Sequence, residues 1–463
     1  MVLRTIGNIN RVHFLYASLN STKIMFITVC IVVAALMIDT SIIKIYVFSS
    51  TTTQSLFGLR MVIFLVIGII YVVGQYLILG FIKSKSMKIR TKEQPFLNLM
   101  NRTVTVVQPV LAAVFIFVIF QMTVISRYDT AMIIVATGIS YLLAIVMLGL
   151  LAHRFILWFR SNRNPVVLSY GLASIILAIN CALTLVNVVI NLSYLPPSVY
   201  PHAGVSEPCC NPGSLNDILY TAYSISSILS FIATWVATAL LLYHYSNKLG
   251  KLKYWLIISI PLVYFLTQFL PLFPDLFSGF RQSNPILFSI LYTLIFSWSK
   301  PAGGILFGIA FWTIARRLSQ TSSVVSSYMI ISAFGLVLLF TSNQAVVLLA
   351  STFPPFGLAT TSFVGLSSYL LLVGIYSSAI SVSEDSKLRQ SIRQFAISEP
   401  KLLDSIGTAQ MEQEIQRRVL TIAKQTQTSM AEETGIQSSL TDDDVKEYLE
   451  QVIKEVMKEK GTP

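Results

Sequence analysis

The chain has 463 residues, of which 54% are hydrophobic and only 12% charged, and its mean hydropathy is +0.70. A soluble domain carries about twice that share of charged residues, so the composition excludes an ordinary soluble protein. The net charge of +12 is explained more simply by basic loops on one side of a membrane than by a nucleic-acid partner. We therefore expect an integral membrane protein in contact with the lipid bilayer, and no nucleic acid.

Apolar runs recur along the chain, and each is long enough for a membrane-spanning helix. The first run lacks the short hydrophobic region and small-residue cleavage site of a signal peptide, so we interpret it as a span. The sequence predicts an all-α protein with ten spans, at residues 24–48, 57–82, 103–124, 130–152, 165–191, 217–244, 252–274, 285–315, 323–343 and 357–381. These divide the chain into an N-terminal arm (1–23), a membrane domain (24–381) and a helical tail (382–463).

The basic residues are distributed asymmetrically between the predicted loops. One side of the predicted membrane domain, with both termini, holds 28 of the 33 lysines and arginines. Basic loops resist translocation and stay in the cytoplasm. The sequence therefore predicts a cell-membrane protein with both termini cytoplasmic, whose basic face favours anionic lipid head groups.

The eighth predicted span contains the sequence SWSKPAGG, Ser297 to Gly304. Lys300 places a charge inside an apolar run, Pro301 removes a backbone donor, and Gly303 and Gly304 allow unwinding or close helix approach. One interpretation is a discontinuous helix at a substrate or ion site, which is tolerated where backbone lines a cavity. The other is an over-long run with a turn, in which Lys300 extends outward to the head groups.

Asp39 is the single acid well inside a predicted span, and two partners suit it. Lys44 lies about one turn further along the same span and neutralises Asp39 near the head groups in the simpler interpretation. Pairing with Lys300 is the alternative, because charges inside membranes usually pair. The sequence FPPFG (353–357) cannot continue a helix and predicts an outer loop or the mouth of a re-entrant segment.

Two long segments resemble each other and suggest an internal repeat. The stretches beginning at Leu59 and Leu252 align without a gap, and two later pairs of spans share nearly the same offset of 193 positions. The aligned pairs include Tyr71 with Tyr264, Gln75 with Gln268, Pro109 with Pro301, and Gly171 with Gly365. An offset of five spans would invert the second half, as in many transporters. Gln75 and Gln268 favour hydrogen bonds between helices and are also candidates for a transport path.

The tail contains two apolar helical stripes. The stronger one, in the amphipathic segment 442–460, consists of Val445, Leu449, Val452, Ile453 and Val456. A weaker one consists of Met411, Ile415, Val419 and Ile422. The two stripes either pack on each other or on cytoplasmic loops, or they dock a cytoplasmic protein partner or mediate self-association.

The cysteines, the histidines and the sequence motifs indicate neither a metal site nor an active site. Cys30, Cys181, Cys209 and Cys210 have neither metal-binding spacing nor a disulfide framework, and the four histidines are scattered. Catalytic motifs such as Gly-x-Ser-x-Gly and His-Glu-x-x-His are missing from the sequence. We therefore expect neither an enzyme nor a bound metal or cofactor.

Residues 353–393 and 402–420 resemble a family of uncharacterised multi-pass membrane proteins of ammonia-oxidising archaea. The resemblance implies a polytopic protein in an archaeal cell membrane and no particular activity. From the broken eighth span and the repeat, the sequence favours transport of a small solute. The alternative is a membrane sensor or scaffold that acts through its C-terminal helices.

Overall fold

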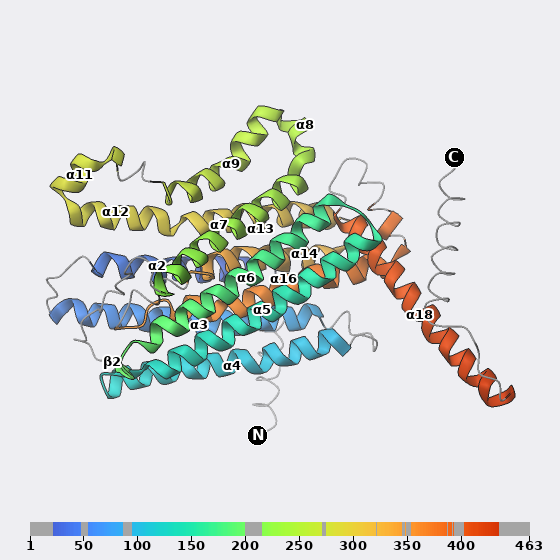
Figure 1. Ribbon diagram of the computed structural model, residues 1–463, viewed down its shortest axis with the longest axis horizontal. Helices are drawn as coiled ribbons and strands as arrows, with labels where there is room; N and C mark the ends of the chain where they lie inside the picture. Colours follow the sequence, from blue (N-terminus) through green and yellow to red (C-terminus); the bar gives the residue numbers. More distant parts are fainter. Residues whose placement is uncertain are drawn as a thin grey trace, which may run out of the picture.

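The computed structural model describes residues 22–47, 54–86, 95–199, 215–270, 275–320, 322–344, 353–386 and 402–434, with a few single positions besides. Nearly all of these residues are helical, and most helices run along the long axis of the molecule (Figure 1). The prediction of an all-α, multi-pass membrane protein is confirmed. Among the described residues, nine helices are long and apolar enough to cross a membrane.

These helices follow the predicted spans closely. In chain order they are α2 (Thr22–Val47), α3 (Gln54–Ser86), α4 (Pro95–Val124), α5 (Thr130–Ser161), α6 (Pro165–Ser193), α7 (Leu215–Leu242), the pair α12 (Pro285–Ser297) and α13 (Ser299–Leu318), α14 (Ser323–Ser342) and α16 (Leu358–Glu384). Two short antiparallel strands, β1 (Tyr128–Asp129) and β2 (Ser198–Val199), join the loop before α5 to the loop after α6.

The seventh predicted span, 252–274, is shorter than expected. It corresponds to α9 (Lys251–Thr267), whose 17 residues are fewer than the roughly 20 that a bilayer requires. Residues 271–274 lie outside the described part of the chain. The short helices η2 (Tyr243–Tyr245) and α8 (Ser246–Leu249) directly precede α9. Helix α11 (Ser278–Ser283), which follows α9, lies at the opposite end of the bundle (Figure 1). The chain thus still passes between the two ends here.

Helix α16 is the centre of the bundle. Every residue from Leu358 to Ile380 is buried, because α14, α5 and neighbouring helices surround it. Glycines permit the close packing: a methyl group on Gly335 would lie 2.7 Å from the backbone nitrogen of Leu371. Small residues at such contacts let membrane helices approach closely, which strengthens their van der Waals packing.

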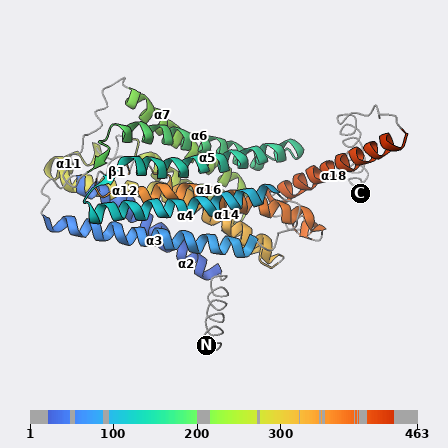
Figure 2. The same ribbon diagram turned by 90° about the horizontal axis from the view of Figure 1, so that it is seen from below.

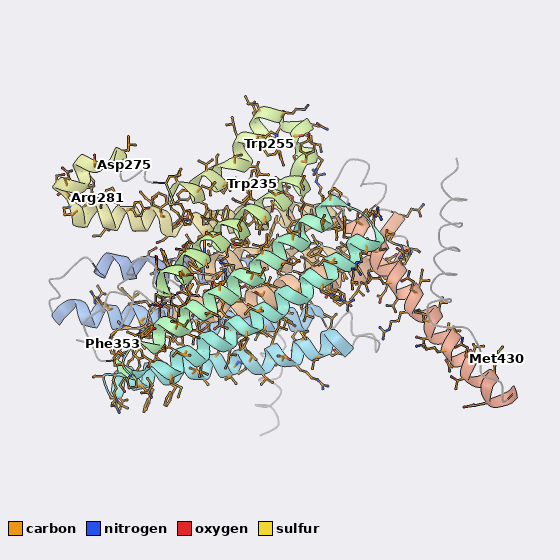
Figure 3. All side chains as sticks on the ribbon, viewed as in Figure 1. Trp235, Trp255, Asp275, Arg281, Phe353 and Met430 are labelled. Atoms are coloured by element: carbon orange, nitrogen blue, oxygen red, sulfur yellow. The ribbon has the colours of Figure 1, made fainter. Side chains whose placement is uncertain are left out.

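The basic helix ends lie together at one end of the bundle. Basic residues occupy the last turns of α3, α5 and α13. The hydroxyl of Tyr328, in the first turns of α14, donates to the carbonyl of Lys85 at the end of α3 (3.1 Å). Asp275 and Arg281 lie at the other end of the molecule from Met430 (Figure 3). The charge asymmetry in the sequence therefore corresponds to two distinct ends in space.

The tail contains α18 (Leu402–Thr434), which is anchored at this basic end. Leu402, Leu403 and Ile406 are buried, and the Trp158 indole of α5 donates to the Gln410 side chain over 3.1 Å. Glu412 also accepts a hydrogen bond from the Ser161 hydroxyl of α5, and the C-terminal part of α18 projects away from the bundle (Figures 1 and 2). The weaker apolar stripe lies on this projecting part; the stronger one, Val445 to Val456, lies outside the described residues.

Candidate functional site

The break predicted in the eighth span is a single-residue turn. Helix α12 ends at Ser297, Trp298 adopts a turn, and α13 begins at Ser299. Pro301 is the third residue of α13, where a missing N–H is tolerated because the first turn of a helix has no internal acceptor for it. The discontinuity is real, but the backbone returns to a helix at once.

Gly303 and Gly304 serve close packing and do not unwind the chain. Both are buried inside α13. A methyl group on Gly303 would overlap the Phe231 ring of α7, and one on Gly304 would lie 2.8 Å from Cβ of Phe340 in α14. Of the two roles that the sequence suggested for these glycines, the structure assigns close helix approach. Their packing fixes the first turn of α13, and with it the position of Lys300.

The Lys300 side chain points into the bundle and takes two neutral partners. Its ammonium donates to the carbonyl of Asn343 (3.2 Å) and lies 5.6 Å from the ring centroid of Tyr223. Asn343 is the C-cap of α14, so its carbonyl lies at the negative end of the helix dipole. The cation is therefore stabilised by a helix C-terminus and an aromatic face.

A chain of hydrogen bonds continues from this point through four helices. The Asn343 side chain donates to Asn180 of α6 (2.8 Å) and accepts from the Tyr141 hydroxyl of α5 (3.2 Å). Asn180 in turn donates to Ser226 of α7 (2.8 Å). Asn180, Asn343, Tyr141 and Ser226 are all buried. We call these four residues, with Lys300 and Tyr223, the Lys300 cluster.

Sequence reasoning missed most of the Lys300 cluster. Asn180 was visible as one of three asparagines in its predicted span, and buried polar side chains in membranes usually have hydrogen-bonding partners. Asn343 lies at the very end of its predicted span and resembles an ordinary helix terminus. Only packing brings Asn343 beside Lys300, 43 positions earlier in the chain.

Gln268 lies beside this cluster, whereas Gln75 has a different neighbour. The Ser299 hydroxyl, one residue before Lys300, lies 3.5 Å from the side-chain oxygen of Gln268. Gln75 of α3 contacts the backbone carbonyl of Gln108 in α4, also at 3.5 Å. Each glutamine therefore meets the residues just before the proline of the next span, as a repeat would require.

The aligned glycines Gly171 and Gly365 do not have equivalent neighbours. Gly171 and Gly365 both face α5, where an inverted repeat would place them against different helices. The internal repeat therefore stays a prediction.

Asp39 caps a buried helix and takes no part in the Lys300 cluster. Its carboxylate accepts from the backbone of Gly357 (3.0 Å) and from the backbone and hydroxyl of Thr360 (3.2 and 2.6 Å). These groups form the N-terminus of α16, which attracts a negative charge. Within the described part of the chain Asp39 forms no ion pair with Lys300, and the side chain of Lys44 lies outside it.

The FPPFG segment is buried, where the sequence predicted an outer loop or the mouth of a re-entrant segment. Phe353 stacks on Tyr128 with ring centroids 5.9 Å apart, and Phe356 packs edge-on against Phe64 at 5.6 Å. Gly357 has a φ of +86°, which a side chain would strain. This segment therefore seals the start of α16 inside the protein, where Asp39 supplies the acceptors that water would supply at a surface.

Comparison with known protein families, curated proteins and solved structures finds no match. The resemblance to an archaeal membrane family therefore remains a prediction.

Proposed function

We propose that the protein carries a small anionic solute across the membrane and that the Lys300 cluster forms part of the path. The observation that carries this proposal is a membrane-embedded cation whose neighbours in the described residues include a carbonyl, an aromatic ring and the Cys181 thiol but no carboxylate. Charges inside membranes usually pair with opposite charges and mark substrate or ion pathways. An anionic solute would supply the missing negative charge.

The chemistry of the cluster supports a small, polar ligand. An ammonium has three donors, and one of those of Lys300 is occupied by Asn343. Asn180, Ser226 and the Tyr141 hydroxyl add neutral hydrogen-bonding groups that connect to Asn343, the residue whose carbonyl holds the cation. A carboxylate or similar anion would satisfy the remaining donors without further charges from the protein. The turn at Trp298 also agrees with the broken helices that line transporter sites.

A thiol-accessibility scan tests whether a water path reaches the cluster. Single cysteines from Leu291 to Phe311 are introduced into a chain lacking the native four and labelled from each side with a water-soluble reagent. Transport predicts labelling on the face that carries Lys300, together with protection by small carboxylates. A segment silent from both sides would contradict a water-filled path.

Uptake of a panel of small anions into proteoliposomes tests transport directly. We expect Lys300→Met to abolish uptake and Lys300→Arg, which keeps the charge, to retain part of it. Truncation after Gln410 should leave uptake unchanged, because the anchored turns of α18 remain. If the truncation abolished uptake and Lys300→Met did not, the site would not be the path.

We also propose a second candidate, a membrane scaffold or sensor that acts through α18, because one specific feature favours it. The helix is fixed to the bundle through Gln410 and Glu412, and its later part carries Ile415 and Ile422 as exposed side chains. Exposed apolar side chains on a projecting helix are suited to a partner or to a second copy. Loss of an oligomer on truncation after Gln410, measured by light scattering, would support this candidate; an unchanged mass would argue against self-association.

A further inference from the structure

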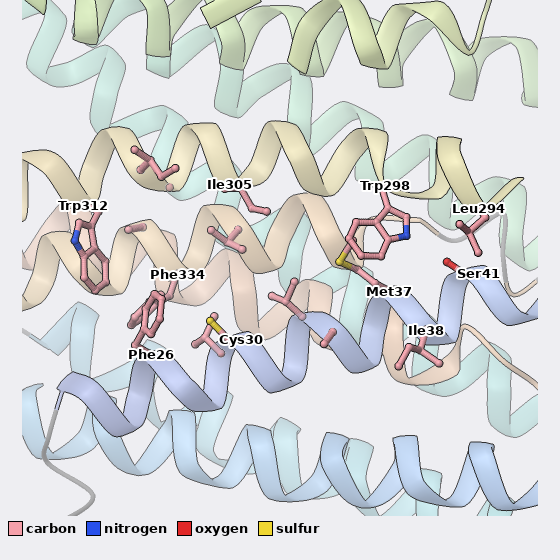
Figure 4. A pocket seen from close by; sticks show the side chains of 17 residues that line it. Phe26, Cys30, Met37, Ile38, Ser41, Leu294, Trp298, Ile305, Trp312 and Phe334 are labelled. Atoms are coloured by element: carbon pink, nitrogen blue, oxygen red, sulfur yellow. The ribbon is translucent and has the colours of Figure 1, made fainter. Parts of the chain in front are cut away.

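An apolar groove runs between α2 and α13, and no residue of the Lys300 cluster lines it. Its volume is about 950 Å³, and Figure 4 shows its lining. Of the seventeen lining residues, one, Ser41, carries a hydroxyl; the others are aliphatic, aromatic or sulfur-containing apart from the two indole N–H groups. Such a lining provides nothing to recognise a charged ligand, and it suits a hydrocarbon.

The groove opens sideways, towards the bilayer. Its walls include Ile38 of α2 and Ile305 and Ile309 of α13, which are 49%, 44% and 51% exposed. Its floor is closed, because a methyl group on Gly308 would already lie 3.0 Å from the backbone oxygen of Ala333 in α14. The two helices that form the walls are apolar enough to span a membrane. The medium that reaches this groove is therefore lipid.

The two ends of the groove differ in chemistry. At one end, Trp312 packs against Phe26 and Phe334 with ring centroids 5.5 and 5.8 Å away, which closes the groove with aromatic rings (Figure 4). At the other end lie Trp298 and Ser41. The Ser41 hydroxyl is buried and has no hydrogen-bond partner among the described residues. A buried hydroxyl of this kind normally has a partner, so the open end has room for a hydrogen-bond acceptor.

The length of the groove fits an extended hydrocarbon chain. Phe26 and Ser41 are fifteen positions apart on α2, which corresponds to about 22 Å along the axis. The length covers roughly two thirds of a hydrocarbon core of about 30 Å.

We propose that this groove binds the hydrocarbon chain of a membrane lipid. The chain lies along α2 and α13 with its terminal methyl towards Trp312. Its linking oxygen, from an ester or ether, accepts a hydrogen bond from Ser41 at the end of the groove marked by Trp298.

A photoreactive stearate with a diazirine near its terminal methyl tests the proposal on the full-length protein in detergent. Stearate carries an extended chain and an acceptor at its head. We expect saturable cross-links to residues around Trp312 and Phe26, which unlabelled stearate displaces. Ala34→Phe, which fills the groove from an exposed position, should raise the stearate concentration for half-saturation at least tenfold. Ala113→Phe, at an exposed position of α4, is the matched control and should change nothing.

Two further variants keep the test decisive. Ile309→Trp fills the groove from the opposite wall and replaces Ala34→Phe if that variant elutes or melts abnormally. Ser41→Ala should weaken binding several-fold while the cross-linked positions stay the same. The contrary result is an even spread of cross-links over the lipid-facing helices, with the same half-saturating stearate concentration for Ala34→Phe and Ala113→Phe. That result would show ordinary lipid contact and overturn the proposal. A dimer that Ala34→Phe dissociates, without saturable cross-linking, would assign the groove to a second copy.

Discussion

Replacing Asp39 by alanine should destabilise the protein through the start of α16. The carboxylate accepts three hydrogen bonds there, from two backbone N–H groups and one hydroxyl. Asp39 is fully buried, as are Thr360 and the segment 353–358 that precedes it. In the alanine variant these donors would have neither the carboxylate nor bulk water.

The magnitude follows from the number of donors left without an acceptor. Each buried unsatisfied group costs about 1–3 kcal/mol, so the two backbone donors alone account for about 2–6 kcal/mol. Removing a buried charge returns part of this cost, because its desolvation is relieved. We expect a net loss of about 3 kcal/mol for Asp39→Ala. Asp39→Asn keeps one carbonyl oxygen as an acceptor and should lose only about 1–2 kcal/mol.

The free energy of unfolding is measured by reversible denaturation in mixed micelles, together with hydrogen exchange of residues 357–361. Thr40→Val is the matched control, since the buried Thr40 hydroxyl bonds within its own helix to the Met37 carbonyl (2.9 Å). This variant should stay within about 1 kcal/mol of the parent. If Asp39→Ala behaves like Thr40→Val and exchange at 357–361 is unchanged, the capping argument is wrong.

Three further predictions concern packing, the tail and orientation. Gly303→Ala should destabilise the protein by about 1–3 kcal/mol through overpacking against a buried ring, whereas Gly149→Ala, with open space at its Cβ position, should be neutral or slightly stabilising in the same unfolding assay. Truncation after Gln410 should leave the thermal midpoint within a few degrees of the parent, because the buried contacts of α18 precede that residue; a large drop would show that the projecting part is structural. Cysteines placed at Met430 and Asp275, both exposed, should be labelled from opposite sides of the membrane, with Met430→Cys reached from the cytoplasm. Labelling of both from one side would contradict the predicted topology.

The helices and their ends were predictable from the sequence because hydropathy acts locally. A run of about 20 apolar residues must satisfy its backbone internally in lipid, so it is helical whatever its neighbours are. The same logic located the break near Lys300, since proline and a charge are unusual in any span. Hydropathy overestimated the length of α9, because the apolar run continues past Thr267 but the helix does not.

The partners of the polar groups could not be predicted in this way. The sequence suggested Lys44 or Lys300 as the partner of Asp39, because a buried acid is expected to pair with a basic residue. Its carboxylate oxygens instead accept hydrogen bonds from backbone donors 318 and 321 positions away. Those donors are free only because FPPFG interrupts the chain inside the bundle. Composition alone does not show that a helix starts in a buried place.

The sequence by itself determined the class of protein, the positions of its spans and the asymmetry of its charge, since these depend on the solvent that each segment tolerates. Only the tertiary structure decided that α16 is central, that Asn180 and Asn343 surround Lys300, and that α2 and α13 leave a groove between them. Each of these depends on which helix faces bring small or polar side chains into contact. In a membrane most faces are equally apolar, so hydropathy does not distinguish them, and close packing and hydrogen bonds choose the arrangement.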